Sequence, residues 1–201
     1  MKQRKKQPIQ TRQAILNAAT LEFSQQGYAG ASLGKIVTSA ELTKGALFHH
    51  FPDKQSLAAA WITERLGAGI LQLWVAPLNT VDSLDALMNL CQIRCKDLAP
   101  SDATSALVSI AAELGHRDER LGTALEHVFH EWRSAFAGVL ERGKLAGWIH
   151  PSIKPETEAI LFVSAFSGFT VTVKTSRTHD TRTVFITALE AYLETLRVQA
   201  S

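Results

Sequence analysis

The sequence has little of what marks secreted, membrane or catalytic proteins. Only two cysteines occur among its 201 residues, which excludes a disulfide scaffold and indicates a reducing compartment. No run approaches the roughly 20 uninterrupted apolar residues that a membrane-crossing helix needs. No apolar segment of signal-peptide type follows the basic N-terminus either. We therefore expect a cytoplasmic protein with no membrane partner.

Motifs of enzymes, metals and cofactors are also missing. The sequence has no Gly-rich phosphate loop, no Walker motif and no evident Ser-His-Asp grouping. His49 and His50 are adjacent, so a helix would point them about 100° apart and they could not easily share an ion. His127 and His130 lie one turn apart within the segment 126–131, but no third ligand is evident. We expect no enzymatic activity, no cofactor and no metal site.

The charge that is present is unevenly distributed. Residues 1–54 hold eight Lys/Arg against three Asp/Glu, a charge of +5, whereas the remaining chain carries −3. A basic end on a mildly acidic body indicates that this end meets a polyanion, although a solvated tail would show the same charge.

Apolar residues recur at helical spacing along nearly the whole chain. Gly27 and Gly147 stop two of these runs, and Ser32, Thr43 and Asp53 stand where N-caps are expected. The segment "GFTVTVKT" is β-branched, but the helical period of "PETEAILFVSAF" before it favours a helix there as well. We predict an all-α fold of about nine helices, over residues 9–26, 32–40, 43–50, 54–75, 82–98, 102–115, 118–146, 156–176 and 180–198.

Two of the predicted helices form a helix-turn-helix pair. The helices at 32–40 and 43–50 are separated by the three residues "AEL", as that motif requires, and the second would lie in the major groove of DNA. Its first residues offer a hydroxyl, a long cation and an unobstructed backbone: Thr43, Lys44, Gly45 and Ala46. One turn further on, Phe48 and His49 suit contact with the sugar-phosphate wall and a thymine methyl.

The segment "TRQAILNAATLEFSQQGYAGASLGKIVTSAELTKGALFHHFPDKQSLA" resembles the DNA-binding domain of the tetracycline-repressor (TetR) family of bacterial regulators. The resemblance covers residues 11–58 and rests on "TR..IL.AA...F...GY" and "TKGALFHHF.DK..L". It implies that Thr43, Lys44, Gly45, Ala46, Phe48 and His49 belong to the recognition helix. It also implies phosphate contacts from Ser32 and Lys54, and we add Lys35 as a further DNA contact.

Three positions depart from the pattern of the family. Glu41 stands where the family usually has a turn glycine, which costs on the order of 1 kcal/mol if its φ is positive. Phe48 replaces the usual tyrosine and so lacks one hydroxyl for a phosphate. Gly34 occupies a position that often carries a base-reading side chain in relatives. Readout should therefore depend more on Lys44 and on the N-terminal arm.

The arm "KQRKKQ" is too polar to fold alone. It resembles extensions that reach along or into the minor groove, in which case Lys5 and Lys6 contact DNA. The alternative is a disordered tail that adds only non-specific affinity.

A weaker resemblance covers the segment "IAAELGHRDERLGTALEHVFHEWRSAFAGVLERGKLAGWI". It looks like the regulatory domain of a TetR subgroup that includes sensors of reactive electrophiles, which often place a cysteine shortly before "AAEL". Ser105 stands there in this chain. Cys91 and Cys95 lie one helical turn apart, where a disulfide would be strained. They are either core residues or, if a thiol has a lowered pKa, a redox sensor.

In the TetR fold the fourth, fifth, seventh and eighth helices surround a ligand cavity. We expect aromatic side chains and the two cysteines to line it, although stripes at helical spacing are core by default. These residues are Trp61, Cys91, Cys95, Phe129, Trp132, Phe136, Phe162 and Phe166. Their number suggests an apolar or aromatic effector.

These patterns predict two domains, a helix-turn-helix domain with a basic arm (1–53) and an effector-binding and dimerisation domain (54–201). The predicted function is a ligand-responsive repressor, released from a palindromic operator by a small effector. It would be a homodimer through the helices at about 156–176 and 180–198. The alternatives are a thiol- or electrophile-sensing regulator using Cys91 and Cys95, and a small-molecule-binding helical protein without a DNA function. Activation in place of repression also stays open.

Overall fold

The computed structural model describes residues 2–99, 102–115, 117–176 and 180–198, with the backbone alone for residues 2–7. These residues form nine continuous helical segments, as the sequence predicted, and no strand. The segments are α1 (Lys2–Gly30), α2 (Leu33–Ser39), α3 (Lys44–His50), the long helix (residues 54–78), α7 (Leu84–Asp97), α8 (Ala103–Leu114), α9 (Glu119–Ala146), α10 (Pro155–Thr175) and α11 (Asp180–Glu194).

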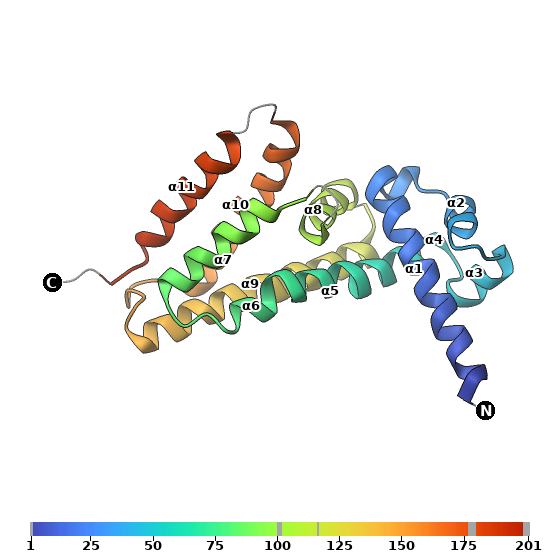
Figure 1. Ribbon diagram of the computed structural model, residues 1–201, viewed down its shortest axis with the longest axis horizontal. Helices are drawn as coiled ribbons and strands as arrows, with labels where there is room; N and C mark the ends of the chain where they lie inside the picture. The colour runs from blue at the N-terminus through green and yellow to red at the C-terminus, as the bar shows by residue number, and fades with distance from the viewer. Residues whose placement is uncertain (1, 100–101, 116, 177–179, 199–201) are drawn as a thin grey trace. The chain divides into compact units, whose positions relative to one another are not determined.

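The first compact unit contains the residues up to Ala68 together with Ala106–Val128. Figure 1 shows α2 and α3 beside α1, and α1 also packs against the start of the long helix. Ile15, Leu16, Ile36 and Leu47 are wholly buried between these helices. A small apolar core of this kind holds the short α2 and α3, which are below the length at which helices persist alone in water.

All three predicted N-caps are confirmed. Ser32, Thr43 and Asp53 each accept a hydrogen bond from the backbone N–H three residues later, at 3.4, 3.2 and 2.6 Å respectively. These bonds satisfy N–H groups that the first turn of a helix leaves unpaired. They fix where α2, α3 and the long helix begin.

The long helix contains two π-helical turns. It consists of α4 (Lys54–Trp61), η1 (Ile62–Leu66), α5 (Gly67–Ile70), η2 (Leu71–Val75) and α6 (Ala76–Leu78). The predicted end at about residue 75, before Pro77, was therefore three residues early. Proline lacks the N–H of an ordinary helical turn, and here the wider turn η2 precedes it and the helix ends one residue after it.

The second compact unit contains Gly69–Ser105 and Phe129–Ser201, within the described ranges. Its core is aromatic: Trp74 lies 4.9 Å from Trp132 and 4.6 Å from Phe166 between ring centroids, and Phe136 stacks on Phe162 at 3.9 Å. Helix α11 packs against α7 and α10 (Figure 1). The domain boundary predicted at residues 53/54 stays a prediction.

Two other helix boundaries differ from the prediction. Helix α1 begins at Lys2 and not at Ile9, so the backbone of the arm continues the helix; Gly27, with φ 69°, interrupts it as expected. Helix α11 ends at Glu194 and not at about residue 198. The reason is a long-range contact, because Arg197 leaves the helix to form an antiparallel bridge with Ile149.

One described helix, α10, is long and apolar enough to cross a membrane by length and composition alone. Core helices of globular proteins pass the same test, and Phe162, Phe166 and Phe169 of α10 belong to the aromatic core. The helix is therefore weak evidence for a membrane segment. The sequence alone had suggested no membrane-crossing helix.

Candidate nucleic-acid interface

Helix α3 has one buried face and one exposed face. Leu47 is wholly buried and Phe51 is 3% exposed, and together they anchor the helix on the core of the first unit. The opposite face presents Thr43, Lys44, Gly45, Phe48 and His49 to solvent. Phe48 is 48% exposed, which is unusual for a large apolar side chain and suits an apolar contact with DNA.

Gly45 has no role in the fold that requires glycine. Its φ is not positive, and an added Cβ would meet nothing nearer than the Thr43 hydroxyl, at 3.9 Å. Glycine inside a helix costs roughly 0.5–1 kcal/mol relative to alanine. A close approach by a ligand is the remaining physical reason for a glycine at this exposed position.

The capping residues keep hydrogen-bonding capacity for a ligand. The hydroxyls of Ser32 and Thr43 act as acceptors in their caps, so each O–H remains available to donate to a phosphate. The Lys35 side chain is exposed on α2 beside them.

The turn between α2 and α3 is strained as the sequence predicted. Glu41 has φ 55° and is the one described non-glycine residue with a positive φ. The N–H groups of Glu41 and Leu42 donate to Thr38 and Val37 of α2, at 3.1 and 3.0 Å. These bonds hold the tight turn although a glutamate occupies the position.

Lys54 is already in contact with the last residues of α1. Its ammonium donates to the carbonyl of Ala29 at 3.1 Å and lies 4.9 Å from the centre of the Tyr28 ring. An ammonium has three donors, so this contact places Lys54 without using its capacity for a phosphate. Burial, with the nearby Asp118, raises the pKa of Tyr28 above its usual value.

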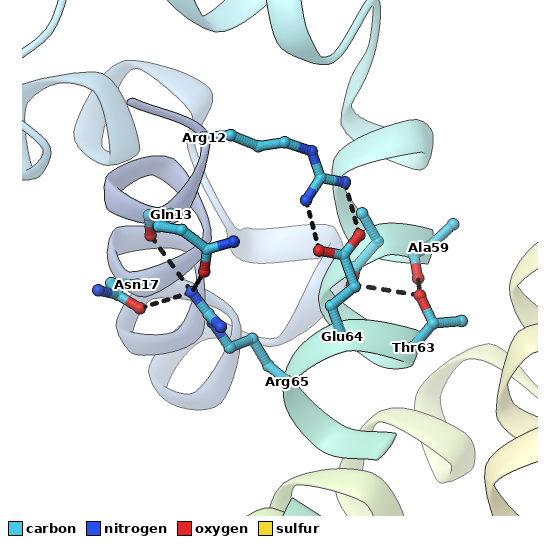
Figure 2. Close-up of polar contacts among 8 residues, drawn as sticks. Arg12, Gln13, Asn17, Ala59, Thr63, Glu64 and Arg65 are labelled. Carbon is cyan, nitrogen blue, oxygen red and sulfur yellow. Dashed lines mark hydrogen bonds and ion pairs between the residues drawn. The ribbon is translucent and has the colours of Figure 1, made fainter. Parts of the chain in front are cut away.

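Helix α1 is tied to the π-turn η1 by two neighbouring side chains. Figure 2 shows the carboxylate of Glu64 accepting two hydrogen bonds from Arg12, while Arg65 donates to Gln13 and Asn17. Adjacent residues of an ordinary α-helix point about 100° apart, but in η1 both reach α1. The hydrogen bond from Arg12 is the main cause that lowers the pKa of Glu64.

The two adjacent histidines, His49 and His50, are the last residues of α3. His49 is exposed and His50 is half-buried, with ring centroids 5.3 Å apart. Burial lowers the pKa of His50, and the nearby His49 and Arg12 add to this effect. Within the described ranges, no three His, Cys, Asp or Glu side chains lie close enough to hold a metal ion.

Four of the residues predicted to bind an effector come together in the aromatic core. Trp132, Phe136, Phe162 and Phe166 are fully buried and in ring contact with one another. The N–H of Trp74 donates to Thr104 at 3.2 Å, whereas the buried N–H of Trp132 has no hydrogen-bond partner. A buried donor without a partner costs about 1–3 kcal/mol and therefore requires an explanation.

The other predicted effector residues lie elsewhere. Trp61 packs on Phe23 in the first unit, 5.0 Å between ring centroids. Phe129 lines an open groove of about 580 Å³ with Arg133, Ile160, Val163, Ser164 and Ser167. Trp74, at the centre of the aromatic cluster, was missed because its place near the end of the long helix gave no signal of a ligand contact.

Cys91 and Cys95 are buried on α7 and are not bonded to each other. Burial raises the pKa of the Cys91 thiol and raises that of Cys95 to about 12, although Arg182 acts in the opposite direction on Cys95. Both thiols are therefore protonated at neutral pH, and the thiolate that reacts with electrophiles is scarce.

Helices α10 and α11 carry large apolar side chains on their outer surface. Ile160, Leu161, Val171 and Val184 are each more than half exposed. Small residues, Ala165, Gly168 and Ala188, line a groove of about 520 Å³ between the two helices. Apolar patches of this kind on a folded chain mark sites of association.

Sequence reasoning missed one residue at the predicted interface. The side chain of Glu113, in the "AAEL" segment of α8, accepts hydrogen bonds from the backbone N–H groups of Tyr28 and Ala29, at 2.7 and 2.6 Å. These residues are separated by more than 80 positions, so no local pattern indicates the contact.

The side chains of Lys5 and Lys6, which were predicted to contact DNA, lie outside the described residues.

Two family models, one for each part of the chain, together match most of its residues. Residues 15–61 match the family described as bacterial regulatory proteins, tetR family, and residues 83–189 match the tetracyclin repressor-like C-terminal domain.

Two relatives match most of the chain, and one of them is named as a transcriptional repressor. The HTH-type transcriptional repressor DhaR of Mycobacterium sp. (strain GP1) is 22% identical over 179 residues, which are 89% of each chain. The A-factor receptor protein of Streptomyces griseus is 28% identical over 162 residues, 80% of this chain. The alignment covers 54% of that protein, so the chain spans about half of its length.

Solved structures share the fold. A TetR transcriptional regulator from Chloroflexus aurantiacus J-10-FL superimposes with a TM-score of 0.83 at 21% identity, covering 97% of this chain and 100% of the other. The reduced form of E. coli NemR gives a TM-score of 0.80 at 19% identity, covering 94% and 98%. At these identities the likeness establishes the fold alone.

Proposed function

The chain belongs to the tetR family of bacterial regulatory proteins and is a DNA-binding transcriptional regulator, and we propose that it is a repressor released from operator DNA by a small effector. As a regulator acting on bacterial DNA it would work in the cytoplasm. We assign it no catalytic role, since the family that it matches is one of regulatory proteins.

Helix α3 is the proposed reader of the operator. The observation that carries this proposal is Gly45, which weakens an exposed helix without a reason in the fold. Beside it, Thr43 and Lys44 offer a hydroxyl and a cation for bases and phosphates. Ser32, Lys35 and Lys54 would contact the phosphates on either side.

The regulator would act as a homodimer through α10 and α11. The exposed apolar residues of these helices support this, because a two-fold dimer must bury a self-complementary patch. Two copies of α3 would then meet half-sites about one helical turn apart, which predicts a palindromic operator.

The proposed effector is an aromatic or apolar molecule that also carries a hydrogen-bond acceptor. The aromatic cluster around Trp132 supports the first property and its unpaired buried N–H supports the second. The name of the A-factor receptor protein describes that relative as a receptor, which agrees with regulation by a ligand.

Repression would end by linkage between the two sites. An effector that binds better to a dimer whose reader helices do not match the groove must weaken DNA binding by the same factor. The long helix begins at Lys54, a predicted phosphate contact, and would transmit the change from the effector site to the reader helix. The thiol-sensing alternative is less favoured, since burial raises the pKa of both thiols.

A mobility shift tests the proposal on DNA upstream of the chain's own gene. We expect a retarded complex that Thr43→Ala and Lys44→Ala weaken. The control Lys96→Ala removes an equal charge from an exposed position on α7 and should leave the complex unchanged. A complex equally stable in all four proteins would contradict the assignment of α3 as the reader. Once a complex is found, its release provides the screen for effectors.

A further inference from the structure

The last residues of α1, beyond its break at Gly27, are held by a carboxylate from α8. The two oxygens of Glu113 accept hydrogen bonds from the successive N–H groups of Tyr28 and Ala29, at 2.7 and 2.6 Å. Hydrogen bonds to an ionised acceptor are short and about twice as strong as neutral ones. Successive backbone N–H groups of this kind form a concavity that suits an anion.

A glycine at position 27 allows the carboxylate of Glu113 to approach the backbone this closely. Gly27 has φ 69°, a conformation that L side chains rarely adopt, and it breaks α1 directly before residues 28–29. A Cβ on Gly27 would lie 2.5 Å from an oxygen of Glu113. The carboxylate therefore sits against bare backbone, in contact that no other residue at position 27 would permit without displacing it.

Residues 28–29 also contact Lys54, which is a predicted phosphate contact. Lys54 donates to the carbonyl of Ala29 at 3.1 Å, and its ammonium lies over the ring of Tyr28. Ser32 follows the end of α1 and its backbone N–H is held by Glu22 at 2.9 Å. The position of residues 28–29 thus sets where the Lys54 ammonium lies, whereas Glu22 holds Ser32.

The corner between α8 and α9 contacts the first turn of the long helix as well. The amide of Gln55 donates to Asp118 at 2.8 Å, and the guanidinium of Arg120 lies 3.4 Å from the hydroxyl of Ser56. Glu113, Asp118 and Arg120 therefore contact the two segments, residues 28–29 and 55–56, that border the predicted phosphate contact at Lys54. All of these contacts lie within the first compact unit.

We propose that Glu113 is a positioning residue of the DNA interface, which holds residues 28–29 so that Lys54 meets a phosphate. The proposal rests on the proposed function and adds to it a contact between α8 and the end of α1 within the first compact unit. A shift of α8 by about 1 Å would lengthen both hydrogen bonds beyond their working range and release residues 28–29.

The experiment measures binding to a 30-base-pair duplex of random sequence, which requires neither an operator nor an effector. The binding constant K falls as salt is added, and each lost phosphate contact makes the slope of log K against log salt concentration less steep by about 0.9. A dimer would lose one such contact in each protomer. Glu113→Ala and Glu113→Gln should therefore make the slope less steep by up to about 1.8, and should weaken binding several-fold at about 100 mM salt. Glu141→Gln, which removes the same charge at an exposed position on α9 outside the contacts described above, is the control and should keep the wild-type slope.

A double-mutant cycle separates positioning from general destabilisation. If Glu113 acts through Lys54, Glu113→Ala should add little to the loss caused by Lys54→Ala. Hydrogen exchange supplies a second readout: DNA binding should slow exchange at Tyr28, Ala29 and over α8, because coupling between sites is reciprocal. Circular dichroism confirms that each variant is folded, and Glu113→Gln replaces the alanine variant if that one is not.

Additive losses, an unchanged slope or unchanged exchange in α8 would overturn the proposal. Wild-type protein that binds no duplex at any salt concentration would instead contradict the proposed function. The two failures are therefore distinguishable.

Discussion

Replacing Gly45 with alanine should stabilise the protein and impair its binding to DNA. Position 45 is exposed in the first turn of α3, and the added methyl group would be 3.9 Å from the nearest atom, an ordinary contact. Removing glycine from a helix contributes about 0.5–1 kcal/mol to stability. For a chain of this size, 1 kcal/mol raises Tm by roughly 2–4 °C.

The same methyl group would lie where α3 approaches the duplex. Forcing an extra carbon into a packed contact costs about 1–3 kcal/mol, which is about 5- to 150-fold in Kd. Thermal unfolding and fluorescence anisotropy on operator DNA measure the two effects in one preparation. A gain in stability together with a loss of affinity identifies a residue kept for function.

Gly34→Ala is the matched control. Gly34 is the second residue of α2, as Gly45 is of α3, and it is also exposed, with a nearest atom at 3.5 Å. The family often has a side chain at position 34, so this variant should gain similar stability and keep its affinity for DNA. Equal affinity of both variants would refute the assignment of Gly45 to close DNA contact.

Three further changes test other parts of the structure. Glu41→Gly should unfold at a higher temperature than Glu41→Ala, by roughly 2–4 °C, because only glycine relieves about 1 kcal/mol of strain at φ 55°. Leu161→Glu should convert the dimer to a monomer in sedimentation, whereas Leu145→Glu, at a position 89% exposed on α9, should not. Cys91 and Cys95 should react with N-ethylmaleimide at pH 7 far more slowly in the native protein than after unfolding, since burial raises both pKa values.

Each of these expectations has a clear opposite. Equal melting temperatures for the glycine and alanine variants would mean that position 41 carries no backbone strain. A monomer from both leucine variants, or from neither, would argue against α10 as the dimer surface. Rapid labelling of the native thiols would return the thiol-sensing alternative to first place.

Local chemistry explains why much of the fold was predictable. Caps at Ser32, Thr43 and Asp53 and stops at Gly27 and Gly147 act within a turn or two of the chain, so their signals are visible in the sequence. The strain at Glu41 was anticipated in another way, from the resemblance to a family that usually has glycine at this turn position.

Contacts between distant residues explain what was missed. The early end of α11 depends on the bridge between Arg197 and Ile149, and the contact of Glu113 with residues 28–29 joins residues more than 80 positions apart. No periodic pattern encodes such a pairing. Trp74 was missed because tryptophan near a helix end gives the same signal in a core as in a ligand site.

Selection from a pool of random duplexes is the most direct test of the central claim, that α3 reads DNA sequence in a two-fold dimer. Purified protein should enrich a palindrome whose half-sites are about one helical turn apart, and Lys44→Ala should change the preferred bases or lose the enrichment. Enrichment of no sequence by the wild-type protein, or of the same sequence with equal strength by Lys44→Ala, would contradict it.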